Sequence, residues 1–415
     1  MSSAPSEPEP VVTRSRIPRD VWALGAVSLL TDMSSELVHS LLPVYLVSTL
    51  GASLLVVGTL DGAAEFVALV VKTFSGRLSD LTGKRKPLVL LGYGLSAFTK
   101  LLFPLANSIG LVVGARLLDR TGKGIRGAPR DALISEITPP ELRGAAFGLR
   151  QSLDTVGAVA GPLLAIAGML MFASDIRTVL WIAVIPGALG VLVLALFVRE
   201  PASVARRVAS VGAHGAAHNT ARSNAHSTAP GLFSGLRTLG PAYWRLVMLA
   251  MLLMFARGTE AFLLLRATSV GLADTWAPLS LVLMSLTYAM TSWPAGRLSD
   301  RVPRERVLSL GIILLAVSHV TLSLATDVAW VLAGTALWGV HMGFTQGTVS
   351  AMLADRSPPA MRGTAFGVYA TASGIALLMS GVAGGALWQS VSPAATFAMG
   401  AIAAVMSLVF LRTMK

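Results

Sequence analysis

Long apolar runs recur down the whole chain, and each is long enough to cross the hydrocarbon core of a bilayer. Of the 415 residues, 54% are hydrophobic and 13% are charged, which is about half the charged share of a soluble domain. We predict twelve spans, at residues 21–47, 53–76, 87–106, 108–131, 145–170, 177–198, 243–267, 273–296, 305–325, 328–352, 362–388 and 393–412. Because the bilayer core offers no water to backbone groups, apolar runs of about 20 residues form helices. Segments of alternating polarity, typical of a membrane barrel, are not seen, and the sequence predicts an all-α integral membrane protein.

Two short tracts recur at nearly constant spacing, which indicates an internal duplication. The tract Gly-Arg-Leu-Ser-Asp at 76–80 returns unchanged at 296–300, and Arg-Gly-Ala-Ala-Phe-Gly at 143–148 returns as Arg-Gly-Thr-Ala-Phe-Gly at 362–367. The offsets are 220 and 219 residues. Many secondary transporters are duplicated helical bundles with a site at the repeat interface. We therefore expect two pseudo-symmetric six-helix bundles.

The distribution of basic residues argues against a nucleic-acid partner, although the net charge is +12. Basic residues gather in alternate loops, such as 84–86, 199–207 and 301–306, while the intervening loops hold almost none. This positive-inside pattern predicts cytoplasmic termini in a multi-pass membrane protein, which we expect in the bacterial inner membrane. Residues 1–20 lack the apolar core of a cleavable signal peptide.

Four segments follow from the spacing of the spans: a cytoplasmic tail at 1–20, a bundle at 21–198, a cytoplasmic linker at 199–241 and a second bundle at 242–412. The linker is rich in Ala, Ser, Gly and Arg, and it contains His214, His218 and His226. A histidine-containing tract can bind metal. The irregular spacing favours a flexible basic linker instead.

The loop after the second predicted span carries a recognisable signature. Residues 76–86 read Gly-Arg-Leu-Ser-Asp-Leu-Thr-Gly-Lys-Arg-Lys, which resembles the G-x-L-a-D-r-x-G-r-k loop of the major facilitator superfamily. The half-length repeat and the twelve predicted spans agree with that family. The second copy departs from the pattern, because Pro303 replaces the glycine and Glu305 interrupts the basic run.

The resemblance implies a group of gating residues on the cytoplasmic side that latches the outward-facing state. Asp80 at the membrane edge can accept charge-assisted bonds from arginines on neighbouring helices. The basic run of the loop also serves to fix orientation, and a plain salt-bridge network is the alternative for the residues of the fourth span. The expected gating residues are Gly76, Asp80, Arg85, Arg126, Arg130, Asp131 and Asp300.

The fifth span carries Gly157, Gly161 and Pro162, in a pattern similar to the G-x-x-x-G-P signature of antiporters in the family. The usual trailing glycine pair is replaced by Leu164 and Ala165. Small residues four apart allow close helix contact whatever the direction of transport. The tract is therefore read either as an antiporter signature or as plain packing.

Three ionisable residues of the first span, Asp32, Glu36 and His39, share one helix face. Ionisable groups in the apolar layer cost about 3 kcal/mol or more each, so they face a water-filled cavity or a partner. We expect Asp32 and Glu36 to carry protons, with His39 in the substrate site. The alternative is a static ion pair with the fourth span.

The fourth span is unusually polar, with seven charged residues between positions 116 and 131 on one side of the helix. The glycines in this stretch and Pro129 predict an irregular or kinked lower half. By resemblance, Arg116 is assigned to proton coupling. We expect Asp119, Arg120 and Lys123 to bind substrate, and an anionic substrate could balance part of this charge.

The second half lacks the charges of the fourth span: Asp119 and Arg120 correspond to Trp338 and Gly339 by the 219-residue offset. It offers Glu260 and His341 as expected substrate ligands, although a lone membrane histidine is often a packing residue. The resemblance implies that the first, fourth, seventh and tenth spans line a central cavity.

These features predict a proton-coupled secondary transporter of a small organic solute, which exports it by antiport. The alternative is a proton-coupled importer of an anionic metabolite or metal chelate. No nucleophile–base set, P-loop, dinucleotide motif or zinc-ligand spacing indicates an enzyme or a cofactor. The surrounding arginines disfavour a bare metal-ion carrier. The expected partners are the solute, protons and lipid, for a monomeric protein.

Overall fold

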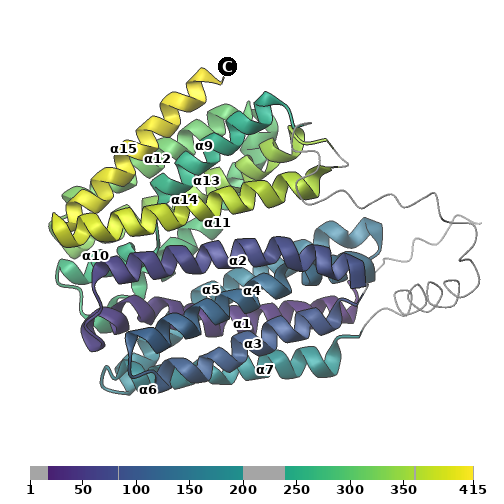
Figure 1. Cartoon of the computed structure of the whole chain (residues 1–415), viewed down its shortest axis with the longest axis horizontal. Helices are drawn as coiled ribbons and strands as arrows, with labels where there is room; N and C mark the ends of the chain where they lie inside the picture. Colours follow the sequence, from purple (N-terminus) through teal and green to yellow (C-terminus); the bar gives the residue numbers. More distant parts are fainter. Residues whose placement is uncertain (1–16, 83, 200–238, 359–360, 415) are drawn as a thin grey trace, which may run out of the picture.

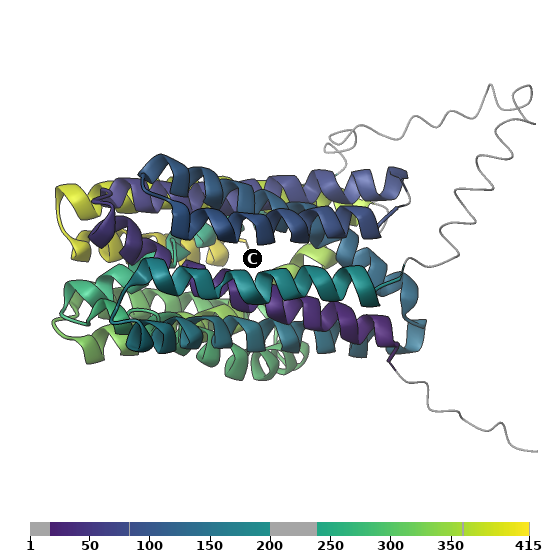
Figure 2. The same cartoon turned by 90° about the horizontal axis from the view of Figure 1, so that it is seen from below.

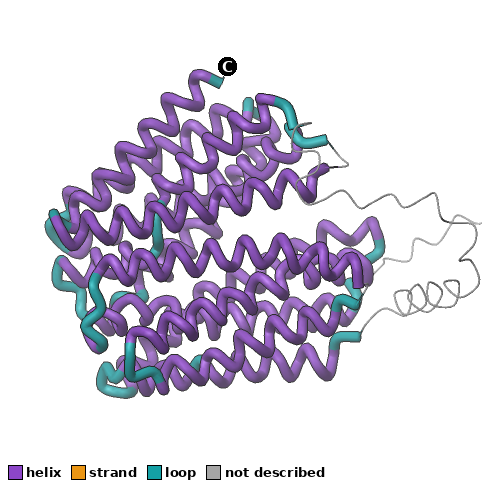
Figure 3. The backbone as a smooth tube through the Cα atoms, viewed as in Figure 1, coloured by secondary structure: helices purple, strands orange, loops and turns teal. Residues whose placement is uncertain are grey.

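The computed structural model describes residues 17–82, 84–199, 239–358 and 361–414. Apolar runs have formed long helices joined by short loops, and the described ranges contain no strand (Figure 3). The helices run roughly in a common direction (Figure 2). Two bundles, one from each half of the chain, lie side by side with α2 and α14 at their boundary (Figure 1).

The N-terminal bundle contains six spans, two of which combine two helical elements. Its elements are α1 (Arg19–Val44) with the π-helical turn η1 (Tyr45–Thr49), α2 (Leu54–Thr82), α3 (Lys86–Leu105), α4 (Ile109–Ile137), the short η2 (Pro140–Leu142), α5 (Arg143–Met171), α6 (Ile176–Ile182) and α7 (Val184–Phe197). Asp175 caps α6 by accepting from the Arg177 N–H. The Thr178 hydroxyl also donates to Asp175 and holds the pKa of that carboxyl below its usual value.

The C-terminal bundle repeats this count of six spans. Its elements are α9 (Pro241–Arg257) with α10 (Ala261–Ser269), the short η4 (Asp274–Trp276), α11 (Leu279–Arg301), α12 (Arg304–Leu324), α13 (Val328–Asp355), α14 (Arg362–Ser390) and α15 (Pro393–Thr413). The expected all-α fold of twelve helices in two six-helix bundles is confirmed. The expected tail 1–20 and linker 199–241 lie almost entirely outside the described residues.

Three of the predicted spans need correction. The sixth span is two helices that meet at Ala183, and the seventh breaks after Arg257, where Gly258 has a φ of 70°. The eighth was expected to begin at residue 273, but its helix begins at Leu279 because η4 and Pro278 precede it. For the fourth span the irregular backbone is not found, since α4 is helical from Ile109 to Ile137, while the kink expected as the other possibility stays a prediction.

Glycines allow helix backbones to approach closely at the main contacts. A Cβ on Gly58 of α2 would lie 2.2 Å from the Gly381 carbonyl oxygen of α14. A Cβ on Gly122 of α4 would lie 2.7 Å from the Gly92 carbonyl oxygen of α3. Substitution at these glycines therefore separates the helices, so α4 uses its glycines for packing and remains one continuous helix.

Ten of the helical spans are long and apolar enough to cross a membrane. The two that are not among them are α4 and α11. Large apolar side chains also cover the outside, for example Leu196 at 64% and Ile402 at 63% exposure. Such a surface suits lipid, where exposed apolar groups are not penalised.

Candidate functional site

Helix α1 brings Asp32 and Glu36 to the contact with α5. A Cβ on Gly157 would lie 2.6 Å from the Leu29 carbonyl oxygen and 3.1 Å from the Asp32 Cβ. A Cβ on Gly161 would lie 2.8 Å from the Glu36 Cβ. The small residues of the fifth span therefore fix the height and orientation of the α1 carboxylates.

His39 is the junction of several carboxylates, and it is only 5% exposed. Its Nδ1 lies 3.3 Å from a Glu36 oxygen, and its Nε2 lies 3.4 Å from a carboxylate oxygen of Asp61 on α2. A carboxylate only accepts hydrogen bonds, so ionised partners at both nitrogens favour the doubly protonated, cationic ring. The Nδ1 atom also lies 4.0 Å from a carboxylate oxygen of Glu260, which comes from the other half of the chain.

Arg116 extends this cluster into α4. One guanidinium nitrogen lies 3.4 Å from Asp61, and another lies 4.0 Å from Asp119. Asp119 is 2% exposed and lies 2.8 Å from the ammonium of Lys100 on α3. In this conformation Asp119 is therefore buried and paired with α3, and its expected contact with substrate stays a prediction.

The next residues of α4 differ in their exposure. Arg120 is 3% exposed and pairs with Glu65 of α2 at 3.1 Å. Lys123 is exposed, and it forms no ion pair with any described residue. Of the expected substrate-binding residues on α4, Lys123 alone is freely accessible here.

Glu260 lies in the link between α9 and α10. It accepts a hydrogen bond of 3.0 Å from Arg257, whose guanidinium stacks on the ring of Trp338 in α13, 5.0 Å from its centroid. His341 is 1% exposed and donates from Nδ1 to the Trp338 carbonyl. The described contacts of His341 thus support Trp338 and do not join His341 to the His39 cluster.

The expected gating residues of α4 form a second polar group. Arg126 donates to the Ser96 hydroxyl at 2.6 Å and stacks on Tyr93 of α3. Arg130 bonds Ser28 of α1 and pairs with Asp131 at 3.1 Å. A third member comes from α5, where Arg150 pairs with Asp154 at 2.7 Å and lies 4.0 Å from Asp131.

The other expected gating residues lie near the ends of the helices. Gly76 packs toward Ala128 of α4, Arg85 pairs with Glu136 at 2.8 Å, and Asp300 is exposed near the end of α11. The side chain of Asp80 lies outside the described part of the chain. The expected latch between Asp80 and the α4 arginines stays a prediction.

Sequence reasoning missed Asp61, Glu65 and Lys100. Asp61 and Glu65 are carboxylates four residues apart inside an apolar run, which is the spacing that singled out Asp32 and Glu36. The same rule applied to every span would have found them. In the described ranges no group of three or more His, Cys, Asp or Glu residues is arranged to hold a metal ion.

The comparisons with known proteins agree with this architecture. The sequence profile of the Major Facilitator Superfamily matches residues 24–283 and 246–414. An uncharacterised MFS-type transporter of Methanocaldococcus jannaschii is 30% identical over 396 residues, which cover 94% of this chain and 93% of the relative. The multidrug resistance protein MdtH of Photorhabdus laumondii is 33% identical over 168 residues, 40% of each chain.

Solved structures show the same fold at low identity. A POT family transporter in complex with 5-aminolevulinic acid has a TM-score of 0.76 at 14% identity, covering 95% of this chain and 96% of the other. A single-site mutant of the nucleoside transporter NupG has a TM-score of 0.75 at 13% identity, covering 95% of this chain and 99% of the other. With its profile match, its relatives and its twelve-helix fold, the chain is a multi-pass membrane transporter of the major facilitator superfamily.

Proposed function

We propose that the chain is a proton-coupled transporter that exports a small organic solute by antiport through alternating access. The observation that carries this proposal is the contact of His39 with carboxylates from both halves of the chain. A proton that leaves His39 or joins one of these carboxylates changes the attraction between the halves. Proton loading is thereby linked to the relative position of the two bundles.

The charges around this contact balance one another. The carboxylates are Glu36, Asp61, Glu65 and Glu260, and the cations are His39, Arg116, Arg120 and Arg257. Breaking a buried pair by removing one partner costs about 3–5 kcal/mol. In a balanced cluster, a single added proton therefore forces the pairs to rearrange, which suits a coupling site.

The described polar contacts between the halves support one conformational state. They join His39 to Glu260 and, at 2.7 Å, Ser174 to Thr275. Ser174 precedes α6 and Thr275 lies in η4, at the end of the bundles away from residues 199 and 239. With cytoplasmic termini, as the basic loops predict, contacts at that end support an inward-facing state. The proposal includes a monomer that works in the bacterial inner membrane.

Export is favoured by the partial similarity to MdtH, a multidrug resistance protein, and by the fifth-span glycines. The alternative is proton-coupled import of an anionic metabolite or metal chelate, which the exposed Lys123 favours. The structure weakens the sequence argument for an anionic substrate. Asp61 and Glu65 already supply charge that a substrate was expected to bring.

Transport by purified protein in liposomes tests the proposal. A pH gradient is imposed, and flux is measured for a panel of anionic, cationic and chelated solutes. We expect gradient-driven flux in the wild type and loss of coupling in Asp32→Asn, Glu36→Gln and Glu260→Gln. The exposed Glu141 gives a matched control, Glu141→Gln, that keeps normal flux. Flux that ignores the gradient in the wild type excludes proton coupling.

A further inference from the structure

The seventh span is interrupted where it meets the His39 cluster. Helix α9 ends at Arg257 and α10 begins at Ala261, and Gly258 in the link has a φ of 70°. A helix end leaves the carbonyls of its last turn without intrahelical partners. In a bilayer such groups must be satisfied by protein or bound water.

Three successive carbonyls at this end accept side-chain hydrogen bonds from three different helices. The Ser380 hydroxyl of α14 donates to the Phe255 carbonyl at 2.7 Å. The His319 Nε2–H of α12 donates to the Ala256 carbonyl at 2.8 Å. The Trp338 indole N–H of α13 donates to the Arg257 carbonyl at 3.3 Å. The break is therefore tied to three neighbours instead of being left free to bend.

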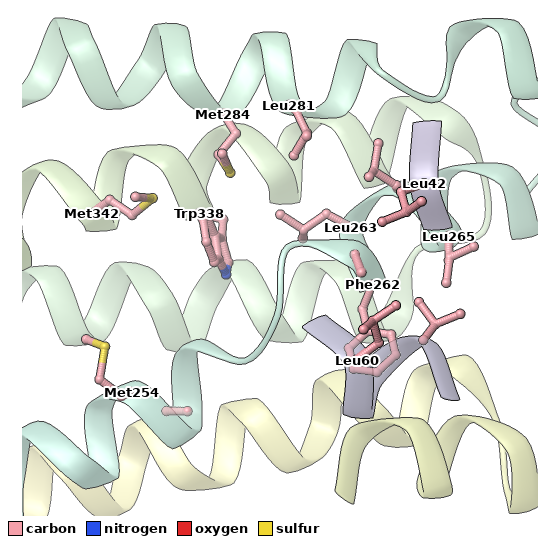
Figure 4. Close-up of a cluster of buried hydrophobic side chains, with 14 of the residues drawn as sticks. Leu42, Leu60, Met254, Phe262, Leu263, Leu265, Leu281, Met284, Trp338 and Met342 are labelled. Atoms are coloured by element: carbon pink, nitrogen blue, oxygen red, sulfur yellow. The ribbon is translucent and has the colours of Figure 1, made fainter. Parts of the chain in front are cut away.

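Figure 4 shows the non-helical link between α9 and α10, with Trp338 facing it and Phe262 just beyond it. A small cavity of about 20 Å³ adjoins the link and is lined by Thr259, His319 and Trp338, among others. This volume suits one water molecule. A Cβ on Gly400 of α15 would lie 2.7 Å from the His319 ring, so the ring is seated against a residue that only glycine suits.

Three residues that line this cavity each carry a buried polar atom with no protein partner: Arg257 Nε, Thr259 Oγ1 and His319 Nδ1. His319 is 4% exposed. Because its Nε2 donates to a carbonyl, the neutral ring presents the bare Nδ1 as an acceptor. The Arg257 Nε–H is a donor, and the Thr259 hydroxyl can serve as either. A water molecule has the donors and acceptors to satisfy all three.

We propose that the α9–α10 link is a fixed elbow, completed by one bound water among Arg257, Thr259 and His319, that aims Arg257 and Glu260 at the His39 cluster. Ser380, His319 and Trp338 are positioning residues in this arrangement. The inference rests on the proposed function only in giving Glu260 a role in coupling. The elbow itself requires only a rigid backbone at the α9–α10 link and one water bound beside it.

Amide hydrogen exchange of the full-length protein tests the elbow without any substrate. In the wild type, Phe262 and Leu263 donate to the Thr259 and Glu260 carbonyls, so their amides report on the link. We expect His319→Leu to raise exchange of the peptide covering 255–263 by about fivefold or more, since one carbonyl loses its donor. His319→Gln, whose amide can donate in its place, stays close to the wild type.

A matched control comes from the residue next to His319. The Ser318 hydroxyl of α12 donates to the Gly334 carbonyl at 2.7 Å, a bond of the same kind that does not touch the link. Ser318→Ala leaves exchange of 255–263 unchanged. Should His319→Leu fail to fold, Gly400→Ala displaces the ring instead and is expected to raise exchange at the same peptide. Wild-type exchange in both His319→Leu and Gly400→Ala overturns the elbow.

An experimental map that resolves ordered waters tests the remaining part. Density for one water in contact with Thr259 and His319 supports the site, and an empty cavity overturns it.

Transport measurements then separate this inference from the proposed function. Unchanged exchange in the variants with normal gradient-driven flux rejects the elbow alone. Raised exchange in the variants, combined with wild-type flux that ignores the pH gradient, retains the elbow and rejects the coupling.

Discussion

Lys100 and Asp119 lie 2.8 Å apart in the interior of the N-terminal bundle, with exposures of 0% and 2%. The hydroxyl of Thr99 is a further donor to Asp119, at 3.4 Å. Taking two charges out of water costs several kcal/mol for each ion. Such a pair gives little net stability, but removing one of its two partners leaves the other as an unpaired buried charge. Arg116 lies 4.0 Å from Asp119 and 3.4 Å from Asp61, between this pair and the His39 cluster.

We predict that Lys100→Met destabilises the protein by about 3–5 kcal/mol, because Asp119 is left as an uncompensated buried charge. The double variant Lys100→Met with Asp119→Leu recovers most of that loss, since the charge is removed with its partner. Thermal unfolding in detergent measures both effects. A double variant no more stable than the single one would show that the pair contributes more than mutual neutralisation.

At the residue scale, the sequence identifies ionic side chains but not their partners. The depth of Asp32, Glu36 and Arg116 follows from counting along apolar runs, and Asp61 and Glu65 could have been found in the same way. The link from His39 to Glu260 joins residues 221 positions apart. Spacing along one helix carries no information on such a contact, which depends on how the halves dock.

Close packing of α5 against α1 is the element-scale feature that most directly affects the site. A Cβ added to Gly157 would lie 2.6 Å from the Leu29 carbonyl oxygen, and one added to Gly161 would lie 2.6 Å from that of Met33. The helix continues through Pro162. Whatever its relation to antiporter signatures, this tract sets the position of α1, and with it of Glu36 and His39, relative to α5.

We predict that Gly161→Ala lowers gradient-driven flux on the order of tenfold, because overpacking by about 1–3 kcal/mol shifts α1 and its carboxylates. Gly148→Ala on the same helix is the control, since a Cβ there meets no atom within 4 Å. Initial rates in liposomes, normalised to the amount of folded protein, provide the comparison. Equal rates for the two variants would mean that the contact does not position the site.

The type and number of elements were predictable because long apolar runs in a bilayer have only the helix available. The breaks inside individual spans were harder to predict from the sequence. Gly258 is one of 40 glycines, and nothing in its local sequence separates it from those that sit inside helices. For α4, glycine and Pro129 suggested irregular backbone, but packing against Gly92 and Ser96 of α3 keeps the helix intact.

For the whole molecule, the contact between Ser174 and Thr275 offers a direct test of alternating access. Their hydroxyl oxygens are 2.7 Å apart, and the chain contains no cysteine. We predict that Ser174→Cys with Thr275→Cys forms a disulfide under mild oxidation and stops transport, because the two ends can no longer separate. Reduction of the disulfide restores the transport rate. Gel mobility reports the cross-link, and flux is measured on the same sample.

Ser174→Cys alone serves as the control and transports normally under the same oxidation. Full activity of the cross-linked double variant would indicate that this end of the bundles stays closed throughout the cycle. That result would contradict the proposed function at the level of the whole molecule.

The pairing of α4 with α2 and α3 also has a consequence for biosynthesis. A charged residue at the centre of a helix costs about 2.5–3.5 kcal/mol on entry from the translocon, and α4 is too polar to be among the ten apolar spans. Asp61, Glu65 and Lys100 are translated earlier, so their side chains are available when Arg116, Asp119 and Arg120 emerge from the ribosome. We therefore expect the three helices to partition into lipid together, and neutralising Glu65 or Lys100 to lower the efficiency with which α4 inserts.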